Sequence, residues 1–473
     1  MQIIEAAQFD NYWKEQNKII NTGLEADSAD TIVREIIQAV RLNGDAALKI
    51  YTERFDKSCP EQFEVPFSAA QTAWDNLCKE DPELAAALKL AGNNIKTFAD
   101  LQRKQYVDFE KQIDKGLFTG QRIIPVECAA VYVPAGRFPL FSSVLMGMIP
   151  ALAAGVQKIF LASPPMEDRF PDHRILAAAA LSISLFKKSS AKNKQNPKLR
   201  IFAIGGAQAI AALALGTESI PRSSVIVGPG NKYVAAAKRL LFGEVGIDFI
   251  AGPSDVLLIA DEKVAENTLE NNIEKAAELI AADILAQAEH DPDARARALV
   301  PSRSMAEKVG AALEKQLTAL PAESQLVARA SLDSGGLIVI YNTREEAIRI
   351  ANSIAPEHME LHVQDHSPWI NNTDNELCLK NYGSLFIGSL AAEVLGDYSA
   401  GVNHTLPTSG GARYTGGLSV QHFLKTVTTL RCVPGTGFEE ARKAAEILGL
   451  AEGLTGHAQA AYLRRIQSTR ELP

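Results

Sequence analysis

Short apolar runs alternate with glycine turns and alanine-rich stretches between residues 128 and 243, and this alternation constrains the fold more than any other feature. The runs that predict buried strands cover residues 128–136, 158–163, 200–206 and 224–230. Each ends in a glycine, proline or serine turn, and alanine-rich helices are predicted at 207–216 and 231–243. Strands and helices in alternation predict a parallel sheet with helices on both faces. Ligands of such sheets bind at the carboxyl ends of the strands, where these turns lie.

A second strand–helix region follows the first. Its predicted strands cover residues 255–262, 336–342 and 383–389, and a long helical run extends from the first of them to about residue 290. The first hundred residues are predicted to be mainly helical, with a helix stop at Asn43-Gly44 and a second helical stretch at 68–106. The last sixty residues are predicted to form a mainly helical tail.

The composition is that of an ordinary globular protein. A length of 473 residues suffices for about two to three domains, and a hydrophobic content of 47% allows a large core. The formal net charge of −8 argues against a nucleic-acid partner. The basic polar stretch 187–198 is predicted to be a solvated surface insertion rather than a binding site.

Cysteine usage and the apolar segments predict where the protein resides. The five cysteines lie far apart without a CxxC pair, which argues against disulfides and a thiolate zinc site and favours a reducing, cytoplasmic compartment. The N-terminus lacks the basic start and apolar core of a signal peptide. The uncharged run 138–157 contains prolines and glycines, which suit a buried loop and helix better than a bilayer span. The sequence therefore predicts a soluble protein with no membrane partner.

Two short segments carry candidate ligands and acid–base groups. Gln287 and His290 stand three residues apart in a predicted helix and would share one face, which suits two ligands of one metal ion. Taken alone, this pair is better explained as a polar helix surface. Pro356 suits the first position of a helix, which would place Glu357 and His358 in its first turn. Adjacent helical residues point in different directions, so this pair would serve two different roles.

Two later segments hold further candidates. The glycine-rich segment 396–408 is predicted to be a loop and concentrates Asp397, Asn403 and His404. Glu452 and His457 lie near the C-terminus, where a lone histidine is usually a surface or core residue. A zinc site built from Gln287, His290, Asp397 and His457 would have mixed nitrogen and oxygen ligands. Spacing alone does not establish this set.

Two glycine turns are candidates for a nucleotide site. The turns Gly205-Gly206 and 228–230 each precede a predicted helix, whose backbone N–H groups can receive phosphate oxygens. Neither turn is a full GxGxxG, so plain strand–helix turns remain an open alternative.

Taken in order, these segments resemble the histidinol dehydrogenase family along nearly the whole chain. The matching segments are 33–48, 131–146, 204–221, 227–234, 251–261, 285–290, 355–363, 396–408 and 453–458. The resemblance implies an NAD-dependent, four-electron oxidation of L-histidinol through its aldehyde to L-histidine, which ends histidine biosynthesis. It also implies one zinc ion per subunit that anchors the substrate.

The resemblance implies roles for individual residues. The residues that match the zinc ligands are Gln287, His290, Asp397 and His457. The residues that match substrate-binding positions are Ser254, His404 and Glu452, together with the zinc ligands and the catalytic pair. In that pair, His358 would take the alcohol proton and Glu357 would activate the water that attacks the aldehyde. The residues that match NAD-contacting positions are Tyr132, Gln208 and Asn231.

The resemblance further implies an α/β fold with two incomplete Rossmann-like parallel-sheet domains, a mainly helical C-terminal tail and an intertwined homodimer. We expect the NAD-side domain to comprise residues 1–30 and 127–252. The second Rossmann-like domain is expected to comprise 31–126 and 253–412, and the tail 413–473.

Two alternatives to this function come from the sequence. Segments 381–388 and 410–429 resemble relatives that oxidise sulfonated diols such as dihydroxypropanesulfonate, so a substrate of that kind is one alternative. A non-catalytic relative that binds metal or nucleotide is the other. The intact pair Glu357 and His358 counts against it, because a scaffold has no need of both.

Overall fold

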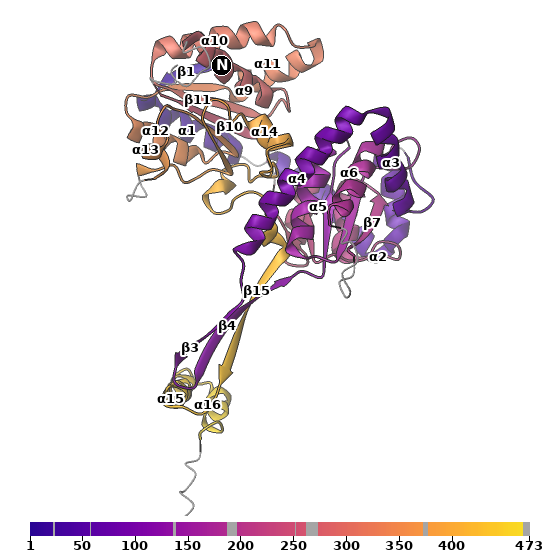
Figure 1. Ribbon diagram of the computed structural model, residues 1–473, viewed down its shortest axis with the longest axis vertical. Coiled ribbons are helices and arrows are strands. Elements are labelled where there is room, and N and C mark those ends of the chain that lie inside the picture. The colour runs from indigo at the N-terminus through magenta and orange to yellow at the C-terminus, as the bar shows by residue number, and fades with distance from the viewer. Residues whose placement is uncertain are drawn as a thin grey trace, which may run out of the picture. The chain divides into compact units, whose positions relative to one another are not determined.

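The computed structural model describes residues 1–21, 24–56, 58–135, 139–186, 196–250, 252–261, 273–371 and 377–466. Most of the predicted surface insertion, residues 187–195, lies outside these ranges. The chain divides into two compact units, one made of residues 1–100 and 127–423 and the other of residues 101–126 and 424–473. The first unit holds two six-stranded sheets, which we call sheet A and sheet B (Figure 1).

Sheet A is entirely parallel, with the strand order β1-β12-β11-β10-β13-β14. Its strands are β1 (Gln2–Glu5), β10 (Asp255–Ala260), β11 (Arg295–Val300), β12 (Leu337–Ile340), β13 (His358–His362) and β14 (Ser384–Ile387). From β10 the chain continues to one side through β11 and β12, and then returns to the other side through β13 and β14. Such a sheet is doubly wound, with its switch point between β10 and β13.

Alternate strand residues of sheet A pack on helices at opposite faces, because successive side chains of a strand point to opposite sides. Val256 and Leu258 belong to the core under one helical layer, while Leu257 and Ile259 belong to the core under the other. The first layer consists of α9 (Ile273–Ala288), α10 (Arg303–Leu317) and α11 (Ala322–Gly335). The second consists of α1 (Ala6–Asn21), α12 (Arg344–Ile354) and α13 (Ser367–Ile370). A short helix, α14 (Glu393–Tyr398), follows β14.

Sheet B has the order β2-β7-β6-β5-β8-β9, and only β2 is antiparallel to its neighbour. Its strands are β2 (Glu64–Val65), β5 (Cys128–Tyr132), β6 (Lys158–Ser163), β7 (Lys198–Ala203), β8 (Val225–Val227) and β9 (Gly246–Ile247). The strands predicted from the four apolar runs are therefore confirmed. The switch point of sheet B lies between β5 and β8, where the chain changes direction across the sheet.

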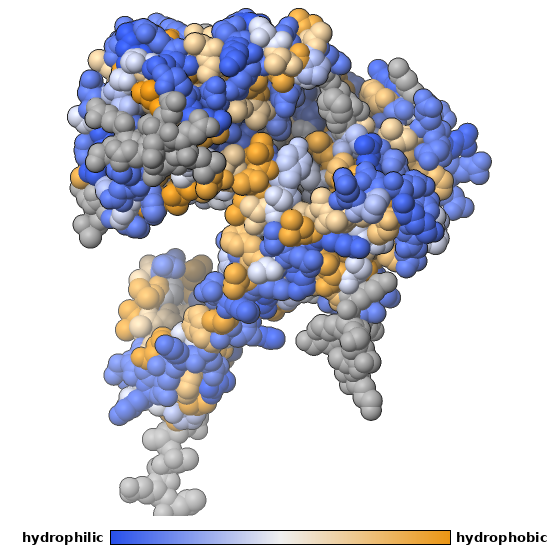
Figure 2. Space-filling model, turned by 45° about the horizontal axis from the view of Figure 1, so that its top comes forward, coloured by the Kyte–Doolittle hydropathy of each residue, from blue (hydrophilic) through white to orange (hydrophobic). Residues whose placement is uncertain are grey.

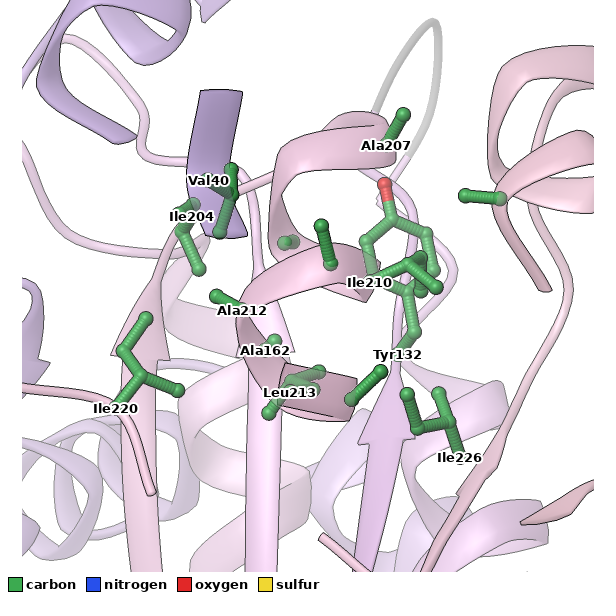
Figure 3. Close-up of a cluster of buried hydrophobic side chains, with 14 of the residues drawn as sticks. Val40, Tyr132, Ala162, Ile204, Ala207, Ile210, Ala212, Leu213, Ile220 and Ile226 are labelled. Carbon is green, nitrogen blue, oxygen red and sulfur yellow. The ribbon is translucent and has the colours of Figure 1, made fainter. Parts of the chain in front are cut away.

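Helices cover both faces of sheet B. The helices of this region are α2 (Leu24–Asp56), α3 (Phe67–Glu80), α4 (Pro82–Lys104), α5 (Ser142–Ala154), α6 (His173–Ser184), α7 (Gly206–Leu215) and α8 (Lys232–Leu241). One core gathers Val40 of α2, Leu213 of α7 and Ile226 of β8 around Tyr132 (Figure 3). Nearly every residue of α5 is buried, as expected for the uncharged run 138–157. Among the described residues, no helix is long and apolar enough to cross a bilayer.

The N-terminal segments differ from the expected domain division. Strand β1 pairs with β12, with Gln2 beside Leu337, so residues 2–5 belong to sheet A and not to the domain of 127–252. Helix α2, expected with sheet A, packs against α7 and α8 of sheet B. A four-residue strand leaves too short a pattern to reveal its partner. Gly44 has a non-helical conformation with φ at 50°, so two helices meet at a kink within α2, in agreement with the helix stop predicted at Asn43-Gly44.

The second unit contains strands that the sequence interpretation missed. An antiparallel sheet of order β15-β4-β3 consists of β3 (Phe109–Asp114), β4 (Leu117–Pro125) and β15 (Leu424–Cys432). Two helices follow, α15 (Thr436–Ala451) and α16 (Thr455–Tyr462). The prediction of a mainly helical tail is therefore wrong for 424–432, where β-branched residues favour a strand. Residues 413–423, expected in the tail, belong to the first unit.

Alanine substitutions at two glycines should change the free energy of unfolding in opposite directions. Gly228 has φ at +117°, and a Cβ there would lie 2.1 Å from the carbonyl oxygen of Tyr132. Gly310 lies inside α10, and a Cβ there would meet no atom within 4 Å. We expect Gly228→Ala to lower the free energy of unfolding by about 2 kcal/mol or more, and Gly310→Ala to raise it by about 0.5–1 kcal/mol. Thermal denaturation of the two variants checks this, and a stable Gly228→Ala protein would contradict the described turn.

Candidate functional site

A pocket of about 790 Å³ opens at the carboxyl ends of β5, β6 and β7 and beside the switch point of sheet B. Tyr132 ends β5, Gly206 begins α7 and Asn231 precedes α8, and all three line the pocket. Helix α2 supplies the opposite wall, including Tyr51 and Asp56. The pocket lies where the doubly wound arrangement predicts a ligand site.

The structure brings together the three predicted NAD-contacting residues Tyr132, Gln208 and Asn231 at this pocket. The hydroxyl oxygen of Tyr132 accepts a hydrogen bond from the N–H of Gly206 at 3.1 Å, and burial raises the pKa of this hydroxyl to about 12. Figure 3 shows the ring beside α7 with its oxygen directed toward the end of that helix that carries Ala207. The tyrosine therefore stays neutral and holds the glycine turn in place.

The polar groups of Gln208 and Asn231 differ in their local bonding. Asn231 caps α8, because its Oδ1 accepts hydrogen bonds from the N–H groups of Tyr233 and Val234, both at 3.1 Å. Gln208 is fully buried, and neither its amide oxygen nor its amide nitrogen has a hydrogen-bond partner within the protein. A buried amide without partners is costly unless a ligand completes it.

Asp56 is a further polar group at this pocket, which the sequence interpretation did not single out. Its carboxylate accepts a hydrogen bond from the backbone of Gly205, while its Oδ2 is buried without a partner. Burial raises the pKa of this carboxyl to about 6, although the Gly205 hydrogen bond opposes the rise. A partly buried carboxylate with a free oxygen in a pocket is a candidate acceptor for ligand hydroxyl groups.

Strand β13 carries polar side chains on one face and apolar ones on the other. His358, Glu360 and His362 alternate with Met359 and Leu361, and all five residues are buried. The apolar pair belongs to the core beneath α1 and α12. The three polar residues lie on the opposite face of the sheet, where α9 and α14 contribute further polar side chains.

The catalytic pair expected from the resemblance does not begin a helix. Helix α12 ends at Ile354, Ala355 adopts a left-handed conformation at φ 52°, and His358 is the first residue of β13. The prediction of a helix start at Pro356 is therefore wrong. A proline can precede a strand as well as begin a helix, and here the chain after Pro356 enters β13. Glu357 and His358 have different partners, and their two different roles stay a prediction.

His358 is surrounded by carboxylates. Its Nε2 lies 3.4 Å from Oδ1 of Asp397, and its Nδ1 lies 3.8 Å from Oε2 of Glu393. Burial lowers the pKa of His358, but Glu393, Asp397 and Glu357 outweigh burial and raise the pKa to about 10. These carboxylates therefore favour the protonated form of the imidazole.

Glu357 is fixed by reciprocal hydrogen bonds with Asp255. The N–H of Glu357 donates to Oδ1 of Asp255 at 3.0 Å, and the N–H of Asp255 donates to Oε2 of Glu357 at 3.2 Å. Arg297 pairs with Asp255 at 3.2 Å and so stabilises its charge. Burial raises the pKa of Glu357 to about 7. A carboxyl with this pKa can accept a proton near neutral pH.

Most of the site residues predicted near sheet A line one cavity of about 230 Å³. Gln287, His290 and Asp397, three of the four predicted zinc ligands, line it together with Glu357 and His358. Gln287 lies in the last turn of α9, whereas His290 lies just beyond the helix end and not within the helix as predicted. Asp397 lies on α14, whereas the sequence predicted a loop for residues 396–408.

The three residues that line the cavity fit a zinc ion by their chemistry. They offer an amide oxygen, an imidazole nitrogen and a carboxylate oxygen, which are donors that zinc accepts. Burial raises the pKa of Asp397, but the neighbouring side chain of His358, with smaller effects of His404 and His290, outweighs burial and lowers it. The carboxylate is therefore ionised, as a metal ligand must be.

The predicted substrate-binding residues of the first unit lie at the same cavity. Ser254 and His404 both line it. The Nδ1 of His404 lies 2.9 Å from the carbonyl oxygen of Asp397, and its Nε2 lies 3.1 Å from the hydroxyl of Ser143 on α5. Burial lowers the pKa of His404, so its ring is neutral. Asn403, also a sequence candidate, donates to the carbonyl of Met146 and fixes the loop.

Glu452 and His457 belong to the second unit. Glu452 follows the last residue of α15, and His457 lies in α16. Both side chains are exposed within that unit. Their assignment as a substrate-binding residue and a zinc ligand stays a prediction.

A different group of residues meets a geometric criterion for metal binding among the described residues. Asp283 of α9 lies with Glu360 and His362 of β13, with their ligand atoms within 4.8 Å of one another. The Nε2 of His362 already lies 2.9 Å from Oε2 of Glu360. Burial and the charge of Glu360 raise the pKa of Asp283 to about 9, so this side chain is a neutral acid near pH 7. None of the three lines the 230 Å³ cavity, which argues for a closed hydrogen-bonded cluster.

The structure thus defines a class of protein. It is an α/β protein with a pocket of about 790 Å³ at the switch point of one parallel sheet and a buried cavity lined by ionisable side chains beside the other. Comparison with known proteins identifies the family. Residues 21–465 match the model of histidinol dehydrogenase.

Relatives and a solved structure agree with this match. The chain is 41% identical over 444 residues to histidinol dehydrogenase of Thermus thermophilus, covering 94% of this chain and 96% of the relative. It is 40% identical to the Aquifex aeolicus protein of the same name, with 92% of each covered. The crystal structure of histidinol dehydrogenase from Elizabethkingia anophelis superposes with a TM-score of 0.79 at 32% identity, covering 92% of this chain and 91% of that one.

The chain belongs to the histidinol dehydrogenase family and is an oxidoreductase. The resemblance seen in the sequence and the α/β fold with parallel sheets are therefore confirmed. The sulfonated-diol alternative finds no support in these relatives. The non-catalytic alternative finds none either.

Asp56 and Asp172 give opposite predictions for stability as a function of pH. The pKa of Asp56 is raised in the folded protein, so its ionisation destabilises the fold as the pH rises through about 6. We expect Asp56→Asn to raise the melting temperature by about 1–3 °C at pH 8 and by less at pH 5.

Asp172 is the matched control. It caps α6 and pairs with Arg174, and although burial raises its pKa, these hydrogen bonds outweigh burial and lower it. Its carboxylate therefore stabilises the fold above its unfolded pKa, and Asp172→Asn should lower the melting temperature at pH 8. Calorimetry at both pH values checks the pair of variants. A loss of stability in Asp56→Asn at pH 8 would show that its carboxylate is better paired than described.

Proposed function

We propose that the protein oxidises L-histidinol through its aldehyde to L-histidine, with NAD as the oxidant and zinc as the anchor for the substrate. The observation that carries this proposal is the meeting of Glu357 and His358 with Gln287, His290 and Asp397 at one buried cavity. These residues come from separate parts of the sequence. Their convergence on one cavity has a ready explanation if a small substrate reacts there.

Gln287, His290 and Asp397 would hold the zinc ion, with His457 as the predicted fourth ligand. The bound ion would supply a fixed point of attachment for nitrogen donors of the substrate, and NAD would accept the hydride at each oxidation. Such orientation lowers the barrier for two successive reactions at one carbon.

His358 and Glu357 divide the proton transfers between them. His358 would accept the hydroxyl proton in the alcohol step, since His358 and Asp397 line the same cavity. A zinc ion bound to Asp397 would weaken the pull of this carboxylate on the His358 proton and lower the pKa of the ring, which leaves the ring able to accept the proton. Glu357 accepts a proton from the water that adds to the aldehyde, since its pKa of about 7 suits a general base. Asp255 keeps Glu357 in place through their two hydrogen bonds.

The pocket at sheet B supports NAD as the cofactor. The amide of Gln208 lacks partners within the protein, and the N-terminal turn of α7 offers backbone N–H groups for phosphate oxygens. The free oxygen of Asp56 suits the hydroxyl groups of a ribose. A phosphate in place of a ribose hydroxyl would be repelled by this carboxylate, which favours NAD over NADP.

The second unit supports a homodimer. All of β3 and nearly all of β15 are exposed, and the helices expose the large apolar residues Ile447, Leu448, Leu450, Leu454 and Leu463. Figure 2 shows hydrophobic residues in orange among hydrophilic ones in blue on the surface of this unit. Exposed apolar groups at this density indicate an interface. A second copy of the chain is the simplest partner, since most soluble oligomers are symmetric.

Turnover tests the proposed function directly. Purified, zinc-loaded protein mixed with limiting L-histidinol and excess NAD should form two NADH per histidinol, because the substrate loses four electrons. The measurement is the absorbance of NADH at completion. One NADH per histidinol would limit the reaction to the aldehyde, and none would refute the proposal.

The oligomeric state tests the interface. Multi-angle light scattering should give twice the chain mass for the wild-type protein. Leu448→Glu combined with Leu454→Glu should give the mass of one chain, because two charges would be buried at the interface. Leu326→Glu, at an exposed position of α11, is the matched control and should stay dimeric. A monomeric wild-type protein would refute the dimer.

A further inference from the structure

A layer of ionisable side chains continues from the candidate active site into the interior beside sheet A. Glu393 of α14, Glu360 and His362 of β13 and Asp283 of α9 form this layer, and we call it the buried polar layer. All four side chains are at most 13% exposed. The proposed reaction assigns none of them a role.

Most of the buried polar layer is held by internal bonds. The Nε2 of His362 lies 2.9 Å from Oε2 of Glu360 and 4.0 Å from Oδ2 of Asp283. The backbone N–H of Glu393 donates to Oε1 of Glu360 at 2.6 Å. This last bond fixes the start of α14 against β13.

Glu393 differs from the other members in its unpaired atom. Its Oε2 is buried and has no hydrogen-bond partner, although its side chain is 1% exposed. The nearest ionic partner of this oxygen is Nδ1 of His358 at 3.8 Å, and that nitrogen is also buried and unpaired. Two buried polar atoms that face each other without a hydrogen bond are costly unless they serve a purpose.

The separation of 3.8 Å is longer than a hydrogen bond. Hydrogen bonds of catalytic groups are often long before the substrate binds and shorten in the reacting complex. A carboxylate on one ring nitrogen fixes which nitrogen carries the proton and how the ring is oriented.

We propose, on the basis of the proposed function, that Glu393 is a positioning residue for His358. Its carboxylate accepts a hydrogen bond from Nδ1–H, so that Nε2 carries no proton and is directed at the substrate hydroxyl. When the alcohol is oxidised, the O–H bond breaks and its proton forms a bond to Nε2. The C–H hydride would go to NAD, which would be reduced to NADH, while the carbon and oxygen form the C=O bond of the aldehyde. The carboxylate of Glu393 would balance the positive charge on the ring.

The position of Glu393 in the chain supports this role. Glu393 and Asp397 are four residues apart on α14 and face opposite nitrogens of the same imidazole. The ring is therefore held between two carboxylates of one helix. Because Asp397 is a proposed zinc ligand, Glu393 is the member of the pair that is free to act on His358 alone.

Steady-state kinetics of Glu393→Gln test the proposal. We expect kcat with histidinol to fall about 10- to 100-fold, with KM for histidinol within about threefold and zinc content unchanged. Asp283→Asn is the matched control, because it removes a buried acid of the same layer that does not contact His358. Its kcat should stay within about twofold of the wild-type value.

A double-mutant cycle separates positioning from a general structural effect. In the His358→Asn background, adding Glu393→Gln should lower kcat by no more than about twofold, since the residue acts only through His358. If the decrease in kcat of the double variant equals the product of the decreases of the two single variants, the proposal is overturned. A Glu393→Gln protein with kcat within about twofold of wild type would overturn it as well.

Nitrogen-15 NMR of the zinc-loaded wild-type protein gives a readout that needs neither turnover nor a Glu393 variant. The side-chain resonances of His358, assigned by their loss in His358→Asn, should show a proton on Nδ1 and none on Nε2. A proton on Nε2, in a neutral or a positively charged ring, would refute the positioning role even if histidinol is the substrate. Absence of turnover in the wild-type protein would instead refute the proposed function and leave the NMR result to stand by itself.

Discussion

The burial of ionisable groups against β13 is the constraint on which the rest of the site depends. His358, Glu360 and His362 lie on a face of sheet A that elsewhere packs alanine, valine and leucine against α9. Each of these side chains would be costly there alone. They are tolerated because α9 and α14 supply Asp283, Glu393 and Asp397 as partners. The strand and both helices must therefore stay in register, which holds the proposed acid–base centre rigid.

The two sheets use opposite ends for their sites. The pocket of sheet B lies at the carboxyl ends of its strands, as doubly wound sheets predict. Glu357 and His358 lie instead at the amino end of β13, and Ser254 precedes β10. Residues of α5 and of the loop after β8 line the same cavity, so both domains of the first unit contribute to it. The cavity holds the substrate in our account, and the fold brings its residues together from both sheets.

The sequence predicted seven of the twelve strands of the two sheets, because fully buried strands such as β8 leave few other interpretations, and it missed β1, β2, β9, β11 and β13. It failed where local signals were ambiguous. Pro356 suggested a helix start although His358 begins a strand, and β15 was taken for part of a helical tail. Asp255 and Glu393 were missed because their significance comes from partners about 100 and 35 residues away along the chain, respectively. An acid four residues before Asp397 was a signal that could have indicated Glu393. The site residues themselves came from the family resemblance, since their spacing alone did not join them.

The central claim is that one divalent ion lies beside Glu357 and His358. Anomalous diffraction at the zinc edge from crystals of the zinc-loaded protein tests it most directly. The account predicts a peak within about 2.0–2.2 Å of donor atoms of Gln287, His290 and Asp397. A peak among Asp283, Glu360 and His362 in place of that one, or no peak at either position, would contradict it.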